Sequence, residues 1–231
     1  MSKITDVLDI DAGFMDDELL GVQMRLLAGL VAGDPASQRQ RVPAGWLGYE
    51  DALVLRMNQL IAEMQLRGQA APEPLPLSRE SILWPFQGVL NLDAQLGLLT
   101  ERLQQGRSGR IRLPRNDHEL WASYKYSLLA RNQGAYQSFG QRIASRSIPL
   151  AELWQALLYA SRTPPTVGGV RNALQHMWGY VSAHSRFNPQ SGELAALLAE
   201  VQQQARTHRV PYLLNSTALG ELGVWVRTLA A

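Results

Sequence analysis

The sequence predicts an all-α protein, and three features indicate this fold class. Apolar residues recur at three- and four-residue spacing in most segments, which is the period of an amphipathic helix. These segments end at glycine, proline or Asn/Asp residues, which are typical of helix caps and turns. No segment shows sustained period-two alternation with β-branched residues, so strands are expected to be minor or absent.

The first half contains three expected helices. Asp16 and Asp17 can cap the first, because carboxylates accept hydrogen bonds from the free N–H groups of a first turn. Gly68 provides the stop of the second. The helices are expected at about 17–33, 47–66 and 90–104, and the proline-rich segment 70–78 is expected to be extended.

The second half contains six expected helices, separated by short breakers. The stretch 105–115 before them carries four arginines, two glycines and a proline, and we expect it to be a basic linker. This predicts two packed helical modules, at 1–104 and 116–231. The six helices are expected at 117–133, 135–146, 150–162, 170–184, 192–207 and 216–229.

Composition excludes several classes of site. The absence of cysteine excludes disulfides, thiolate metal sites and a cysteine nucleophile, and it fits a reducing compartment. The start of the chain lacks the apolar core of a signal peptide, and no apolar run is long enough to span a membrane. We therefore expect a cytoplasmic protein.

Charge is unevenly distributed along the chain. Residues 1–100 carry 7 cationic against 13 acidic residues, a net charge of −6, whereas residues 101–231 carry 15 against 7, a net charge of +8. The clearest basic patch is in the linker, where flexible arginines could follow the phosphates of a nucleic acid. Two alternatives stay open: a solvated linker, and docking of these arginines onto the acidic first half. The four residues are Arg107, Arg110, Arg112 and Arg115.

The first half carries the pattern G-W-x-G-Y-E-x-A-L at residues 45–53, followed by a helix that ends at Arg67-Gly68. This pattern resembles the pyrimidine-dimer DNA glycosylase (endonuclease V) superfamily over residues 14–70. The resemblance implies an all-α fold and attack on the sugar by an N-terminal amine, which Ser2 would present after removal of Met1. However, the expected catalytic glutamate would fall near Arg25, and no carboxylate lies between Glu18 and Asp34. We therefore expect that the glycosylase–lyase chemistry is lost.

The second half carries three motif segments: Y-K-Y at 124–126, N-x-L-Q-H-x-x-G-Y at 172–180, and V-P-Y-L-L with a following threonine at 210–217. Together they resemble the YbgA-like domain of unknown function, the DUF1722 family, over residues 116–222. That family occurs beside photolyase genes and fused to thiouracil desulfurase or glycosylase-like domains. The resemblance therefore implies handling of pyrimidines, in DNA or as free bases.

Two residues of these motifs are the candidates for chemistry. Lys125 lies between two tyrosines, and if buried it is expected to act as a base, as a Schiff-base amine or as an anion-binding group; the alternative is an exposed lysine. His176 has Asn172 and Tyr180 one turn to either side, so either is placed to hydrogen-bond the imidazole; the alternative is a satisfied core histidine. The expected ligand-binding residues are Tyr124, Tyr136, Asn172, Gln175 and Tyr180.

These residues lead to three functional hypotheses. The first is a nucleic-acid or nucleobase-handling protein of DNA repair or base modification, with a pyrimidine stacked on an aromatic ring such as Tyr136 or Trp178. The second is a non-catalytic accessory module with a protein partner, and the third is an active glycosylase using the Ser2 amine. Histidine spacing disfavours a metal site, and no motif indicates a cofactor.

Overall fold

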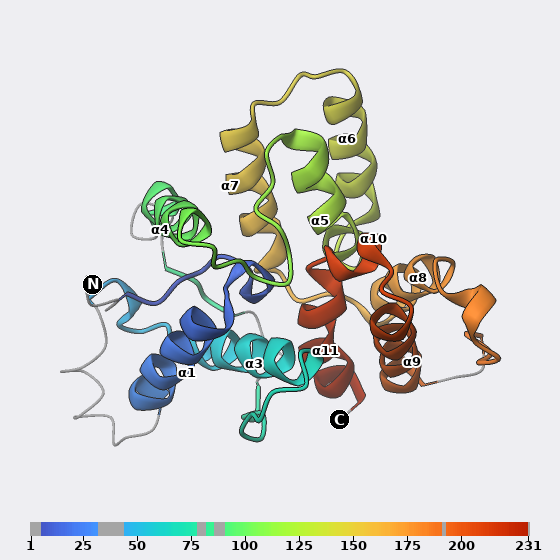
Figure 1. The fold of residues 1–231 in the computed structure, drawn as a ribbon, viewed down its shortest axis with the longest axis horizontal. Helices are drawn as coiled ribbons and strands as arrows, with labels where there is room; N and C mark the ends of the chain where they lie inside the picture. The colour runs from blue at the N-terminus through green and yellow to red at the C-terminus, as the bar shows by residue number, and fades with distance from the viewer. Residues whose placement is uncertain (1–5, 32–43, 78–81, 86–90, 191–192, 231) are drawn as a thin grey trace.

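The computed structural model describes residues 6–31, 44–77, 82–85, 91–190 and 193–230, and these contain helices but no strand (Figure 1). The all-α prediction is therefore confirmed. None of the described helices has the length and apolar character needed to cross a membrane. Short 3-10 turns lie at Ala12–Phe14 (η1), Ala44–Trp46 (η2) and Ser182–His184 (η3). The α-helices are Asp17–Val31 (α1), Glu50–Leu66 (α3), Leu92–Gln104 (α4), Asp117–Leu129 (α5), Gln133–Ala144 (α6), Leu150–Ser161 (α7), Val167–Trp178 (α8), Leu194–Thr207 (α9), Pro211–Leu214 (α10) and Ala218–Ala230 (α11).

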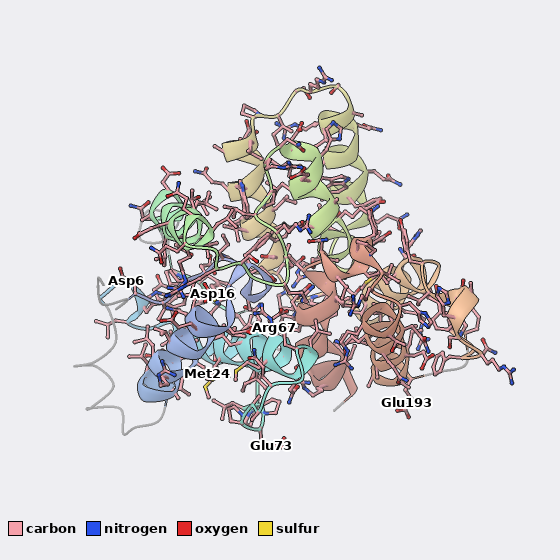
Figure 2. The ribbon with its side chains drawn as sticks, viewed as in Figure 1. Asp6, Asp16, Met24, Arg67, Glu73 and Glu193 are labelled. Carbon is pink, nitrogen blue, oxygen red and sulfur yellow. The ribbon has the colours of Figure 1, made fainter. Side chains whose placement is uncertain are left out.

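Most helix ends lie within a few residues of the predicted positions, because local capping groups set them. Asp16 lies at the start of α1 (Figure 2), where its Oδ1 accepts the N–H groups of Glu18 and Leu19 at 3.1 Å. Gly68, just beyond α3, has a φ of 72°, which favours glycine. The helix expected at 170–184 is shorter in the structure: α8 ends at Trp178, and the 3-10 turn η3 follows.

Helix α11 is the central element of the fold. It packs against α3 on one side and against α9, α5 and α8 on the others (Figure 1). Leu219 and Leu222 of this helix have no exposed surface. Helix α11, from the end of the chain, therefore joins a helix of the first half to the helices of the second half.

The segment before α1 also enters the core of the second half. Ile10 is fully buried, and the ring of Phe14 lies 6.0 Å from that of Tyr124 on α5 and 5.4 Å from that of Trp154 on α7. The described residues of the two predicted modules thus share one hydrophobic core. The division into residues 1–104 and 116–231 stays a prediction.

The expected basic linker is packed tightly onto η1. Ile111 is 1% exposed, and its N–H donates to the carbonyl oxygen of Gly13 at 2.8 Å. A Cβ at Gly109 would lie 2.4 Å from that same oxygen, so only glycine permits this approach of two backbones. The linker is therefore part of the folded body of the protein.

Glu63 of α3 holds this linker in place through an ion pair. Its carboxylate is 2% exposed and accepts hydrogen bonds from Arg67 at 2.8 Å and from Arg110 at 2.8 and 2.7 Å. Burial raises the pKa of Glu63, but the charges of Arg110 and Arg67 outweigh it and hold the pKa below its ordinary value. Arg110 also donates to the carbonyl oxygens of Leu214 and Ser216 at 2.6 and 3.1 Å. One guanidinium thus joins α3, the linker and the turn between α10 and α11.

We expect Arg110→Ala to lower the free energy of unfolding by about 3–5 kcal/mol, because it leaves a buried carboxylate short of a cation. Arg112→Ala is the matched control in the same linker: its side chain is exposed, and we expect a change within about 0.5 kcal/mol. Denaturant unfolding followed by circular dichroism measures both. Equal losses in the two variants would contradict the anchoring role of Arg110.

Candidate functional site

Side chains from three parts of the second half gather at one place on its surface. Lys125 and Tyr126 come from α5, His176 from α8, Tyr180 from the turn after α8, and Tyr212 from α10. We call these five residues the tyrosine–lysine cluster. The three motif segments lie at 124–126, 172–180 and 210–217 in the sequence, and they therefore meet only in space.

The rings of the cluster contact one another closely. Tyr180 stacks on Tyr212, with centroids 4.6 Å apart and an angle of 19° between the planes. His176 stacks on Tyr126 at 6.4 Å and 22°. The ammonium group of Lys125 lies 4.8 Å from the ring centroids of both Tyr126 and Tyr212, within the range of a cation–π interaction.

The inner part of the cluster is buried, and its outer face is exposed to solvent. Tyr126 is 3% exposed, whereas Tyr180 is 43% exposed and His176 is also exposed. Within the described parts of the chain, no carboxylate forms a salt bridge with Lys125. The open face therefore offers aromatic surface beside a cation that no carboxylate neutralises.

The three hydroxyl groups of the cluster have different proton affinities. The Tyr126 hydroxyl donates to that of Tyr180 at 3.4 Å. Burial, and next this hydrogen bond, raise the pKa of Tyr126, and burial and the charge of Tyr180 raise the pKa of Tyr212. The hydrogen bond from Tyr126 lowers the pKa of Tyr180, and the charge of Lys125 acts in the same direction. Tyr180 is therefore the first of the three to lose its proton.

The other predicted ligand-binding residues of this region are placed differently. Asn172 lies one helical turn before His176 on the same face. Among the described residues, neither Asn172 nor Tyr180 hydrogen-bonds the imidazole, which stacks on Tyr126 instead. Tyr136 packs on Trp121 with ring centroids 5.3 Å apart, at the contact of α5 with α6.

Two other side chains of α8, the amide of Gln175 and the indole of Trp178, contact residues of the loop that follows the helix. The amide of Gln175 donates to Oε1 of Gln190 at 3.4 Å and so contacts the following loop. Trp178 is 9% exposed, and its ring lies 5.9 Å from that of Phe187. Trp178 is therefore part of the core and offers no free face for a base.

Tyr124 faces the opposite side of α5 from the cluster. Residues two apart on a helix are separated by about 200°, so Tyr124 and Tyr126 cannot share a face. Tyr124 is 2% exposed, and its ring lies 6.0 Å from that of Phe14 and 5.9 Å from that of Trp154. Tyr124, expected as a ligand-binding residue, is therefore not part of the tyrosine–lysine cluster.

The linker arginines are largely engaged within the protein. Arg107 and Arg110 form salt bridges with acidic residues of the first half, which agrees with docking of the linker onto that half, and Arg115 forms one with a residue of α5. The side chain of Arg112 is exposed. The pairs are Arg107 with Glu18, Arg110 with Glu63, and Arg115 with Glu119.

The first half shows no glycosylase-type acid on its first helix. Ser2 lies outside the described residues. Arg25, near the position expected for the glutamate, is exposed, and α1 carries no carboxylate after Glu18. Among the described residues, no three His, Asp or Glu side chains lie close enough together to hold a metal ion.

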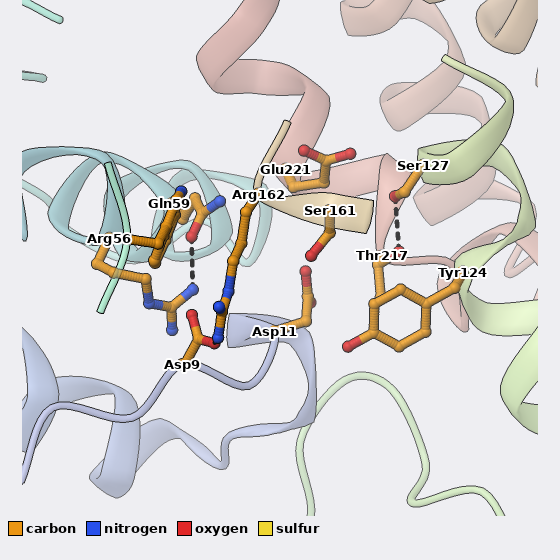
Figure 3. A pocket seen from close by; sticks show the side chains of 11 residues that line it. Asp9, Asp11, Arg56, Gln59, Tyr124, Ser127, Ser161, Arg162, Thr217 and Glu221 are labelled. Carbon is orange, nitrogen blue, oxygen red and sulfur yellow. Dashed lines mark hydrogen bonds and ion pairs between the residues drawn. The ribbon is translucent and has the colours of Figure 1, made fainter. Parts of the chain in front are cut away.

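A second polar centre lies at the junction of the two halves, where the sequence indicated no site. It is a cavity of about 20 Å³, with room for about one water molecule and too small for a nucleobase. Three buried donors on its wall have no partner in the described chain: Nε1 of Trp84, the hydroxyl of Tyr124 and Nε of Arg162. Figure 3 shows Arg56, Arg162 and Asp9 on one side and Tyr124, Thr217 and Ser127 on the other.

Asp11 is a titratable group of this cavity whose pKa is strongly changed by its surroundings. Its carboxylate accepts the N–H of Gly13 at 2.8 Å, and the residue is partly buried. Burial, with the nearby charge of Glu63, raises the pKa of Asp11 to about 7. The cavity therefore contains a carboxyl group that titrates near neutral pH.

Sequence reasoning missed this centre because its partners are far apart in the chain. Arg56 is 3% exposed and donates to the carbonyl oxygens of Leu8 and Ile10 at 3.0 and 2.8 Å, from a helix of the first half to the segment before α1. Arg162 binds Asp9 at 2.6 Å. The signal present in the sequence is the recurrence of Asp6, Asp9 and Asp11 among apolar residues.

Comparison with known proteins identifies part of the chain. Residues 125–221 match the family model described as "Protein of unknown function (DUF1722)". The predicted resemblance of the second half is therefore confirmed, and all five residues of the tyrosine–lysine cluster lie within the match. No curated protein and no solved structure matches the chain. The resemblance of residues 14–70 to the pyrimidine-dimer glycosylases gains no support from these comparisons.

We expect the stability of the protein to fall between about pH 4 and pH 7 because of Asp11. Its raised pKa means that the folded state holds a proton that the unfolded chain has already lost, so unfolding is favoured as the pH rises through this window. The contribution is at most about 4 kcal/mol. The difference in unfolding free energy between Asp11→Asn and the wild type, measured across this range, should therefore grow with pH in favour of the variant. A constant difference would contradict the assignment.

Proposed function

Because residues 125–221 form a DUF1722 domain, we propose that this domain binds a pyrimidine nucleobase, in single-stranded nucleic acid or as a nucleotide, on the tyrosine–lysine cluster. The observation that supports it most is the convergence of three motif segments on one exposed aromatic surface beside a lysine. The pyrimidine class comes from the family resemblance. The small cavity at the junction cannot admit a base, so the ligand is assigned to the surface.

The side chains of the cluster suit this ligand chemically. Stacking of a base on an aromatic side chain contributes about 1–3 kcal/mol, and the exposed ring of Tyr180 and the imidazole of His176 offer such faces. Lys125 supplies a positive charge for a phosphate of the same nucleotide. Stacking against Tyr126 and Tyr212 already orients these groups, so binding would order few side chains.

A second candidate function is a non-catalytic module that binds another protein. The observation in its favour is that two of the four linker arginines are already paired within the chain: Arg110 with the buried Glu63, and Arg107 with Glu18 at the surface. Nucleobase binding on the cluster requires the cluster residues, whereas a protein-binding module does not. This difference allows the two functions to be separated by experiment.

We expect Lys125→Ala and His176→Ala each to weaken binding of a fluorescent single-stranded oligothymidylate about tenfold or more, measured by anisotropy. Loss of the cation or of one stacking face accounts for an effect of this size. Circular dichroism of each variant should match that of the wild type.

Arg146→Ala is the control for loss of a positive charge, because Arg146 is exposed in the turn between α6 and α7, outside the cluster. Its binding is expected to equal that of the wild type. Equal weakening in this variant would show general electrostatic attraction instead of a site. A wild-type protein that binds no oligothymidylate would leave the protein-binding module as the better function.

A further inference from the structure

The tyrosine–lysine cluster concentrates three hydroxyl groups and a cation around one exposed phenol. The Tyr126 hydroxyl donates to the oxygen of Tyr180 at 3.4 Å, and the Tyr212 ring lies under that of Tyr180 at 4.6 Å. Lys125 contacts the faces of both supporting rings at 4.8 Å. A phenol oxygen that accepts a hydrogen bond and lies near an ammonium group is stabilised as phenolate.

The different burial of Tyr126 and Tyr180 determines which of the two hydroxyl groups gives up its proton. Tyr126 is 3% exposed and keeps its proton, whereas Tyr180 is 43% exposed and can meet a ligand. The hydrogen bond from Tyr126 and the charge of Lys125 also lower the pKa of Tyr180. The titratable groups around it are Lys125 and Tyr126 from α5, His176 from α8 and Tyr212 from α10, with Tyr136 of α6 acting on Tyr126 and Tyr212.

We propose that Tyr180 is the proton acceptor of the tyrosine–lysine cluster, and that it takes the proton of an imide N–H, as in uracil or thymine, from the bound pyrimidine. Tyr180 first loses its own proton to the solvent, and in the transfer step the ligand N–H bond breaks as the phenol O–H bond forms again. The negative charge passes from the phenolate oxygen to the imide, where Lys125 can still compensate it. An imide N–H and a phenol are comparably acidic, so the transfer needs no further reactant. The identity of the ligand rests on the proposed function; the role of Tyr180 as an acidic phenol does not.

The acidity of Tyr180 can be measured without a ligand. Near-ultraviolet phenolate absorbance is followed against pH in the wild type and in Tyr180→Phe, and the difference isolates one of the 7 tyrosines. The same subtraction with Tyr159→Phe gives a reference, because Tyr159 is 62% exposed and lies on α7 outside the cluster. Tyr180 is expected to titrate at lower pH than this reference.

Two further variants test the cause of that acidity. In Tyr126→Phe and in Lys125→Gln, the titration of Tyr180 is expected to move to higher pH, because a hydrogen-bond donor or a cation is lost. A Tyr180 that titrates with or above Tyr159 in the wild type would overturn the proposal. So would a Tyr180 titration that neither variant moves.

Recognition of the imide proton by Tyr180, which the transfer requires, is tested with thymidine and N3-methylthymidine, which lacks that proton. The wild type is expected to bind thymidine about tenfold more tightly, and Tyr180→Phe is expected to bind both nucleosides equally. A preference that persists in Tyr180→Phe would be steric and would overturn the proton-acceptor role. If Tyr180 is acidic but neither nucleoside nor oligothymidylate binds, the proposed function fails while the acidic phenol stands. If thymidine binds without discrimination, the function stands and this inference fails.

Discussion

The buried carboxylate of Glu63 is the constraint on which the arrangement of the helices depends. The Glu63 side chain is 2% exposed, so water cannot solvate its charge. Arg67 and Arg110 must therefore stay in contact with it. A Cβ at Gly220 of α11 would lie 2.6 Å from Oε2 of Glu63, so a larger residue there would displace the carboxylate from its arginines. Arg110, which binds Glu63, also donates a hydrogen bond to the carbonyl oxygen of Leu214 at the end of α10. Tyr212 lies two residues before that point, so the position of the surface cluster is tied to an ion pair in the core.

The same network changes how the charge asymmetry of the sequence is interpreted. A basic second half suggested nucleic-acid binding through its linker, but several of its arginines bind acidic residues of the first half. Arg107 binds Glu18, and Arg162 binds Asp9. Opposite charges on the two halves therefore hold the halves together, and the net charge of each half says little about its outer surface.

The sequence predicted most of what depends on local geometry. Helical periodicity and the Asp16 cap placed α1 correctly, and the motifs selected Lys125, His176 and Tyr180, which do meet in space. Tyr124 lies outside the cluster, because helix geometry separates it from Tyr126. The burial of Arg56 could not be predicted, because its partners are backbone carbonyls about fifty residues away, in a segment without regular structure.

Helix α5 connects the two polar centres, since it presents Tyr124 to the cavity and Tyr126 to the surface. Its rotation is fixed from α11, because the hydroxyl of Thr217 lies 2.7 Å from that of Ser127 and its N–H donates to the Ser123 carbonyl at 2.9 Å. A helix held in this way cannot turn one tyrosine without displacing the other. The rings of the cluster are therefore preorganised by contacts in the core, and the free energy of ligand binding need not be spent on orienting them.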